Sequence, residues 1–177
     1  VTPYFNGETR FDKPPLIYWL MAIAYKTIGV NAWAARLPSA LSAIALIGFI
    51  FYVLQKFGFA SSAPKDPSFL KEPWDLKQRD SRWISAWIGS GAIALNLQMV
   101  LWARQGVSDM LLNSYMGAAL IAFFCGYAQL HQPQVQRRWY LSFYIFAALA
   151  VLTKGPVGIV VPGMIIVAFL LYVGNLW

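Results

Sequence analysis

Residues 110–130 read MLLNSYMGAALIAFFCGYAQL, a run that contains no charged side chain. A bilayer core of about 30 Å needs about 20 apolar residues at about 1.5 Å per residue. The run therefore predicts a helix that crosses a membrane. Further apolar runs lie at 37–54, 83–103 and 157–173, with a shorter one at 140–153. The short run ends in Lys154-Gly155-Pro156, so it spans only if its helix continues through this break or if Lys154 lies at shallow membrane depth.

The composition supports a membrane protein. Of the 177 residues, 59% are hydrophobic and 12% are charged. Soluble domains contain about 25% charged residues, so a water-soluble globule is excluded. The aromatic content of 16% is typical of helix ends at a lipid–water boundary. Cys125 is the single cysteine, which excludes a disulfide scaffold.

The loops predict the orientation, because Lys and Arg accumulate on the cytoplasmic side. Six Lys and Arg residues lie in 56–82, and 131–139 adds Arg137 and Arg138. Two spans separate these loops, so both are expected on the cytoplasmic face. The opposite face then receives three segments: 1–13, 104–109 and 154–156. The net charge of +7 is thus mostly a topology signal, and nothing indicates a nucleic-acid partner.

The segment from Pro14 to Val30 is the remaining apolar stretch. Its aromatic residues fit a helix that lies in the membrane interface, and its paired prolines can open that helix. The expected fold class is all-α, a polytopic bundle of about five membrane helices plus an interfacial helix. Residues 1–30 would form an outer loop and the interfacial helix, and 56–82 a cytoplasmic loop.

Charged residues gather on the second face. Asp12 and Lys13 precede two prolines on a stiff backbone; a carboxylate suits a hard cation or a proton, and an ammonium suits a phosphate. Arg104 and Asp109 flank a turn at Gly106, where they can pair or point into a shared cavity. Simpler alternatives stay open, because charges at helix ends snorkel to the interface and Asp109 can cap the next helix.

Lys154 follows the same pattern at the break after 140–153. A lysine there suits an anionic ligand, and the free amides at the start of the next helix would strengthen its field. With Lys13 and Arg104 nearby, three cations would converge opposite few acids. Such a pocket favours a phosphate group.

Four stretches in order resemble the landmarks of a known family. They are FDKPPLIYWL at 11–20, AARLPSA at 34–40, Ala103-Arg104 with Asp109-Met110-Leu111, and TKGP at 153–156. The pattern is similar to that of the GT-C membrane glycosyltransferases of family 39, which are related to protein O-mannosyltransferases and to the aminoarabinose transferase of lipid A.

The resemblance implies an enzyme that moves a sugar from a polyprenyl-phosphate donor to a lipid, glycan or protein acceptor. It implies that Lys13 and Lys154 bind the donor phosphate, that Asp12 holds a divalent metal ion, and that Arg104 and Asp109 shape the catalytic cavity. The family's main carboxylate precedes the part of the chain that begins here. The sequence is therefore expected to be a piece of a longer protein, inactive by itself.

The chemistry agrees with the cluster, since cations stabilise a leaving phosphate and a carboxylate takes the acceptor's proton. The expected location is a bacterial inner or plasma membrane, with the site facing the periplasm or exterior. The alternative is a fragment of a transporter or permease, in which the Lys154 break lines a substrate path. A transporter would place its charges near mid-membrane, whereas a transferase would place them at one rim.

Overall fold

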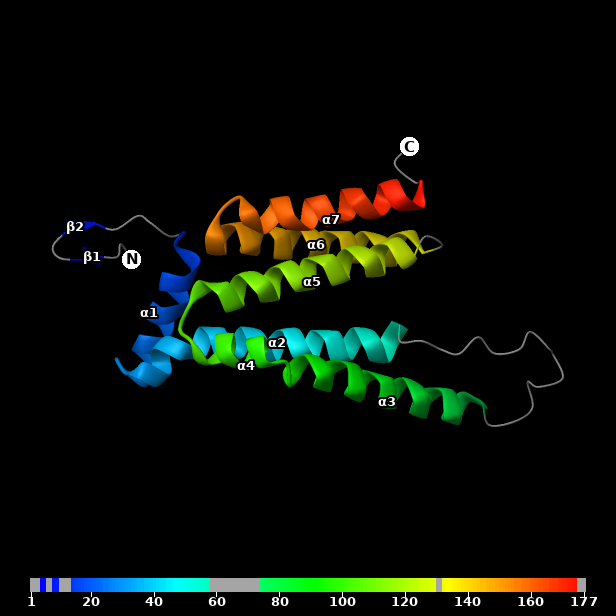
Figure 1. Ribbon diagram of the computed structural model, residues 1–177, viewed down its shortest axis with the longest axis horizontal. Coiled ribbons are helices and arrows are strands. Elements are labelled where there is room, and N and C mark those ends of the chain that lie inside the picture. Colours follow the sequence, from blue (N-terminus) through cyan, green and yellow to red (C-terminus); the bar gives the residue numbers. More distant parts are fainter. Residues whose placement is uncertain (1–3, 6–7, 10–13, 58–73, 130–131, 175–177) are drawn as a thin grey trace. The chain divides into compact units, whose positions relative to one another are not determined.

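The computed structural model describes residues 4–5, 8–9, 14–57, 74–129 and 132–174. Within these ranges the only strands are β1 (Tyr4–Phe5) and β2 (Glu8–Thr9), which pair antiparallel. The helices are α1 (Leu16–Ile28), α2 (Ala32–Phe57), α3 (Trp74–Ala94), α4 (Leu97–Arg104), α5 (Ser108–Ala128), α6 (Pro133–Lys154) and α7 (Val157–Val173) (Figure 1). The predicted all-helical fold class is confirmed.

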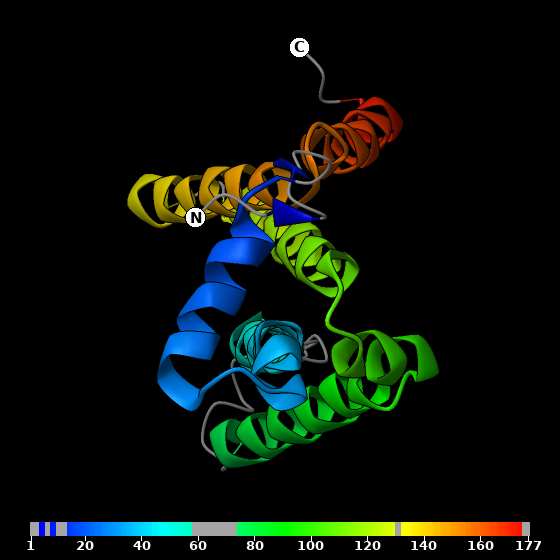
Figure 2. The same ribbon diagram turned by 90° about the vertical axis from the view of Figure 1, so that its left-hand side faces the viewer.

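The chain forms two compact units, one of residues 1–46 with 101–177 and one of residues 47–100. In the first unit, α5, α6 and α7 run side by side, and α1 packs against α6. Figures 1 and 2 both show the first turn of α1 near the turn that joins α6 to α7. The segment that follows the Asp12-Lys13 motif in sequence therefore lies beside the end of α6, which carries Lys154.

The second unit is held by aromatic packing between α2 and α3. The Phe51 ring meets the rings of Trp83 and Trp87 edge-on, with centroid separations of 5.9 and 5.3 Å. Gly89 gives the Leu54 side chain room, because a β-carbon there would lie 2.6 Å from Leu54 Cδ1. Much of Trp87 stays exposed, as lipid-facing aromatics do.

Among the described residues, α2 and α5 are each long and apolar enough to cross a bilayer, and the bent pair of α3 and α4 would form a third span if it crosses as one. At about 1.5 Å per residue the 21 residues of α5 cover about 32 Å, close to a hydrocarbon core. The helix α7, with 17 residues, is a shorter apolar helix. The short run at 140–153 belongs to a longer helix, because α6 begins at Pro133 and includes Arg137 and Arg138.

The predicted span at 83–103 is not one straight helix. It covers the end of α3 and all of α4, which are bent by 60° at a break between Ala94 and Leu97. Asn96 causes this break, since its Oδ1 accepts hydrogen bonds from the N–H groups of Gln98 and Met99 at 3.0 and 3.4 Å. Polar side chains inside an apolar run are expected to bond to other helices. Asn96 instead caps α4, and Gln98 is exposed.

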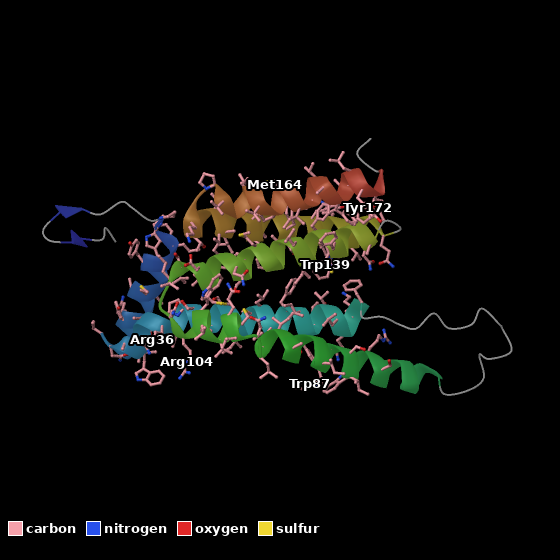
Figure 3. All side chains as sticks on the ribbon, in the orientation of Figure 1. Arg36, Trp87, Arg104, Trp139, Met164 and Tyr172 are labelled. Carbon is pink, nitrogen blue, oxygen red and sulfur yellow. The ribbon has the colours of Figure 1, made fainter. Side chains whose placement is uncertain are left out.

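The surface of the helices is largely apolar. Large hydrophobic side chains are exposed on every helix, including Trp33, Ile88, Leu101, Tyr144, Met164 and Tyr172. Figure 3 shows such side chains pointing outward along α7. Water-soluble monomers rarely expose apolar surface so extensively, whereas lipid solvates it. Together with the spans, this surface identifies an integral membrane protein.

Candidate functional site at the start of α5 and the end of α6

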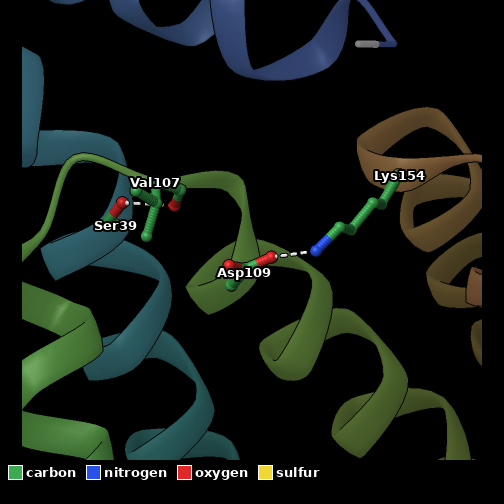
Figure 4. A network of polar contacts seen from close by, with 4 residues as sticks. All are labelled: Ser39, Val107, Asp109 and Lys154. Carbon is green, nitrogen blue, oxygen red and sulfur yellow. Dashed lines mark hydrogen bonds and ion pairs between the residues drawn. The ribbon is translucent and has the colours of Figure 1, made fainter. Parts of the chain in front are cut away.

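An ion pair joins two of the predicted site residues. The Lys154 Nζ donates a hydrogen bond to the Asp109 Oδ1, from the last residue of α6 to the first turn of α5 (Figure 4). The side chains are 48% and 40% exposed. A pair this open contributes about 0.2–1 kcal/mol in water, so an incoming anion can compete for the lysine. Two motifs 45 residues apart in sequence thus meet at one place.

The α6–α7 turn fixes where Lys154 lies. Gly155 ends α6 with φ 78° and ψ −151°, a backbone conformation that residues other than glycine avoid. Gly158 then brings α7 directly onto the backbone of α6, since a β-carbon there would lie 2.4 Å from the Ala150 carbonyl carbon. Thr153 is fully buried and donates to the Leu149 carbonyl at 2.8 Å. The Thr-Lys-Gly-Pro motif is therefore a tight helical hairpin that presents one lysine.

Asp109 lies near the amino end of α5, where the helix dipole favours a carboxylate. The sequence left open whether Asp109 caps this helix. The residue at the cap position is Val107, and no side chain caps it. The Asp109 carboxylate is therefore directed to Lys154 rather than to its own helix.

The loop before α5 is bound to α2. The Ser39 hydroxyl donates to the Val107 carbonyl at 3.1 Å (Figure 4). Gly106 lies so close to α2 that a β-carbon there would be 3.1 Å from the Ala35 carbonyl oxygen and 3.6 Å from Met21 Cε. The landmark at 34–40 thus packs against the loop between Arg104 and Asp109, and Met21 of α1 lies close to the same loop.

Arg104 is not the partner of Asp109, although the sequence allowed these two residues to pair across the turn at Gly106. It is the last residue of α4 and is exposed, and Asp109 pairs with Lys154 instead. In Figure 3 Arg104 and Arg36 lie toward the end of their unit at which α1 is found, whereas Trp139 and Tyr172 lie toward the other end. A cation at the carboxyl end of a helix is favoured by the helix dipole. Asp12 and Lys13 lie outside the described residues.

Metal ligands do not gather in the described part of the chain. No three His, Cys, Asp or Glu side chains there are close enough to hold an ion. Asp109 is the only acidic residue whose side chain is described, and it is engaged by Lys154. The ligand role predicted for Asp12 stays a prediction.

Comparisons with known proteins point to one family. Residues 12–63 match the family described as dolichyl-phosphate-mannose-protein mannosyltransferase. The chain is 30% identical over 92% of its length to an uncharacterized protein of Aquifex aeolicus, of which it covers 30%. It is 27% identical over 97% of its length to the undecaprenyl phosphate-alpha-4-amino-4-deoxy-L-arabinose arabinosyl transferase of Shewanella sediminis, of which it covers 27%.

The fold of the chain also matches solved structures of a membrane protein. ArnT from Cupriavidus metallidurans bound to undecaprenyl phosphate superposes with a TM-score of 0.80 at 25% identity, over 99% of this chain and 28% of that one. The apo structure gives a TM-score of 0.78. The predicted resemblance to the GT-C glycosyltransferases of family 39 is confirmed. The chain spans about 30% of the length of the curated relatives it matches.

The sequence did not predict the roles of Ser39 and Gly158. Ser39 lies in the 34–40 landmark and bonds to the loop before α5, and Gly158 allows α7 to approach α6. The serine directly after a proline inside α2, at Pro38-Ser39, is a usable sequence signal for a hydrogen bond to a group outside the helix. The glycine two residues after Pro156 is a weaker signal for close helix packing, because the sequence does not show which helix packs against Gly158.

Proposed function

We propose that the chain is part of an integral-membrane glycosyltransferase that moves a sugar from a polyprenyl-phosphate-linked donor to a lipid, glycan or protein acceptor. The observation that carries the proposal is the ion pair between Asp109, in the first turn of α5, and Lys154, the last residue of α6. This pair brings two family landmarks together at one end of a helix bundle. The relatives named as arabinosyl transferases of undecaprenyl phosphate donors support the donor class.

In the proposed reaction the bond between the sugar C1 and a phosphate oxygen breaks, and C1 bonds to an acceptor hydroxyl oxygen. The leaving polyprenyl phosphate gains negative charge, so fixed cations lower the barrier. Lys154 is one such cation, and we assign Lys13 the same task. Asp109 and Arg104 belong to the catalytic machinery, where a carboxylate takes the acceptor's proton and Arg104 adds positive charge near the phosphate.

Lys154 is suited to this task because its partner holds it weakly. The lysine side chain is 48% exposed, so its attraction to Asp109 is screened. A phosphate that offers several acceptor oxygens can replace the carboxylate and free it. Binding of the donor would thereby change the surroundings of both Lys154 and Asp109 in one step.

We propose further that this end of the bundle faces the periplasm or the exterior of a bacterial inner or plasma membrane. Arg137 and Arg138 lie in the first turns of α6, at the end away from Lys154. Cations at that end favour its placement in the cytoplasm. Cysteine labelling at positions 60 and 106 checks this, because labelling of both from one side would contradict it.

Asp12 is our candidate ligand for a divalent cation. A carboxylate suits a hard cation, and Lys154 engages Asp109, so the cation would depend on donors other than Asp109. Metal titration of the wild type against Asp12→Asn, read as a shift in Tm, tests the assignment. An equal shift in both would remove Asp12 from the site.

The transporter alternative predicts charges near mid-membrane. Asp109 and Lys154 instead lie at helix ends, in the first turn of α5 and the last residue of α6. This placement favours the transferase. We also propose that residues 1–177 alone do not complete the transfer, since they span about 30% of the relatives' length.

The test is a transfer assay with a radiolabelled polyprenyl-phosphate sugar, using the longest natural form of the protein in lipid vesicles. Lys13→Ala and Asp109→Asn are each expected to lower kcat/KM by at least about 100-fold, the loss of about 2.7 kcal/mol of transition-state stabilisation. The matched control is Lys26→Met, which removes an exposed cation in the last turn of α1 and should transfer normally. Unchanged transfer by both site variants, at normal expression, would refute the site assignment.

A further inference from the structure

Ser39 makes a hydrogen bond unlike those of the other described hydroxyl donors. The hydroxyls of Thr27, Ser42, Ser85, Ser90, Ser142 and Thr153 donate to carbonyls three or four residues earlier in their own helices. Such bonds are the ordinary way in which membrane helices satisfy serine and threonine. The Ser39 hydroxyl instead donates to the Val107 carbonyl, 68 residues along the chain. It joins two separate segments.

The acceptor of this bond begins α5. Val107 is extended, with φ −110° and ψ 154°, and occupies the cap position without help from any side chain. Its carbonyl also accepts the hydroxyl of Ser39, which is fully buried, so this bond holds the start of α5 from another helix. The preceding residue, Gly106, lies so close to α2 that a β-carbon there would be 3.1 Å from the Ala35 carbonyl oxygen. The loop is thus held to α2 by a hydrogen bond at Val107 and by close packing at Gly106.

Asp109 lies two residues after this attachment. The buried side chains of Met110 and Leu111 follow, both with 0% exposure. The attachment fixes the start of the first turn of α5, and so the height and rotation at which Asp109 meets Lys154. The weak ion pair does not set this position by itself, since both partners are about half exposed.

We propose that Ser39 is a positioning residue for Asp109 and, through it, for Lys154. This inference rests on the proposed function for its effect on catalysis. Ser39 does not act on the substrate. Loss of its hydroxyl leaves both charges in place but lets the first turn of α5 shift relative to α2. A shift of this kind lowers the rate of transfer more than the affinity for the donor.

The kinetic test compares Ser39→Ala with Ser42→Ala. Ser42 lies one turn further along α2 and donates to the Ser39 carbonyl at 2.8 Å, so its loss removes a hydroxyl without touching the loop. Ser39→Ala is expected to lower kcat by about 3- to 10-fold, the effect of one hydrogen bond, with KM for the donor changed less than about twofold. An equal effect of the two variants would overturn the proposal.

A double-mutant cycle separates positioning from general damage. If Ser39 acts through Asp109, the Ser39→Ala, Asp109→Asn double variant is no slower than Asp109→Asn alone. Losses that multiply would show that Ser39 acts elsewhere and would overturn the proposal. Ser39→Thr, which keeps the hydroxyl, should recover part of the lost kcat.

A measurement without transfer keeps this test distinct from that of the proposed function. The Tm shifts of Asp109→Asn, Lys154→Met and their combination are measured in the wild type and in Ser39→Ala. The two shifts should be non-additive in the wild type, which reports the ion pair, and additive in Ser39→Ala. Non-additivity that persists in Ser39→Ala would refute the positioning role even if no sugar transfer is found.

Discussion

Replacement of Gly158 by alanine tests the contact between α6 and α7. The added β-carbon would lie 2.4 Å from the Ala150 carbonyl carbon, 2.6 Å from the Val151 nitrogen and 2.7 Å from the Ala150 oxygen. Non-bonded carbon atoms have their optimum at about 3.5–4.0 Å. The neighbours are backbone atoms that no rotamer change can move, so the helices must separate by about 1 Å at this point.

The expected cost follows from that separation. Overpacking of a well-packed core costs about 1–3 kcal/mol, and α7 would also lose contacts further along its length. The affected turn presents Lys154, so transfer should fall along with stability. Thermal unfolding in detergent, followed by circular dichroism, measures the first effect as a lowered Tm.

Gly163→Ala is the matched control. Gly163 lies in the same helix, and a β-carbon there would meet nothing within 4 Å. Alanine is favoured over glycine in a helix by up to about 1 kcal/mol, so this variant should be neutral or more stable. If Gly158→Ala is as stable as Gly163→Ala, the close approach of α6 and α7 is refuted.

Two further substitutions test local backbone geometry. Gly155→Ala should lower stability by about 1–3 kcal/mol although no atom would contact the new β-carbon, because φ 78° with ψ −151° strains any side chain; a Tm equal to that of Gly163→Ala would contradict this. Asn96→Ala should lower stability by about 0.5–2 kcal/mol through loss of the α4 cap, while Asn96→Asp keeps most of it. Equal Tm values for the two Asn96 variants would count against the cap.

The sequence predicted the helices well where hydropathy alone decides them. The run at 157–173 has the bounds of α7, the run at 110–130 is displaced by two residues from α5, and the interfacial segment at 14–30 contains α1. Each of these depends on neighbouring residues and on the cost of an unpaired backbone in lipid. Such information is local and can be read from the chain.

The break at Asn96 shows where local information was insufficient. No proline or glycine interrupts the run from Ala92 to Ala103, so apolarity predicted one continuous span. Asn96 ends it because a short amide side chain can satisfy two free amides at the start of a new helix. The same side chain could equally bond to another helix, and sequence does not choose between the two.

The sequence by itself determined that this is an all-helical membrane chain, that its charges lie at helix ends, and which short motifs carry them. Only the tertiary structure decided that Asp109 pairs with Lys154 rather than Arg104, and that Ser39 binds the loop before α5. The reason is physical: hydropathy and helix geometry act over a few residues. Partners 45 and 68 residues apart depend on how closely the helices pack, and that depends on features such as the missing side chain of Gly158.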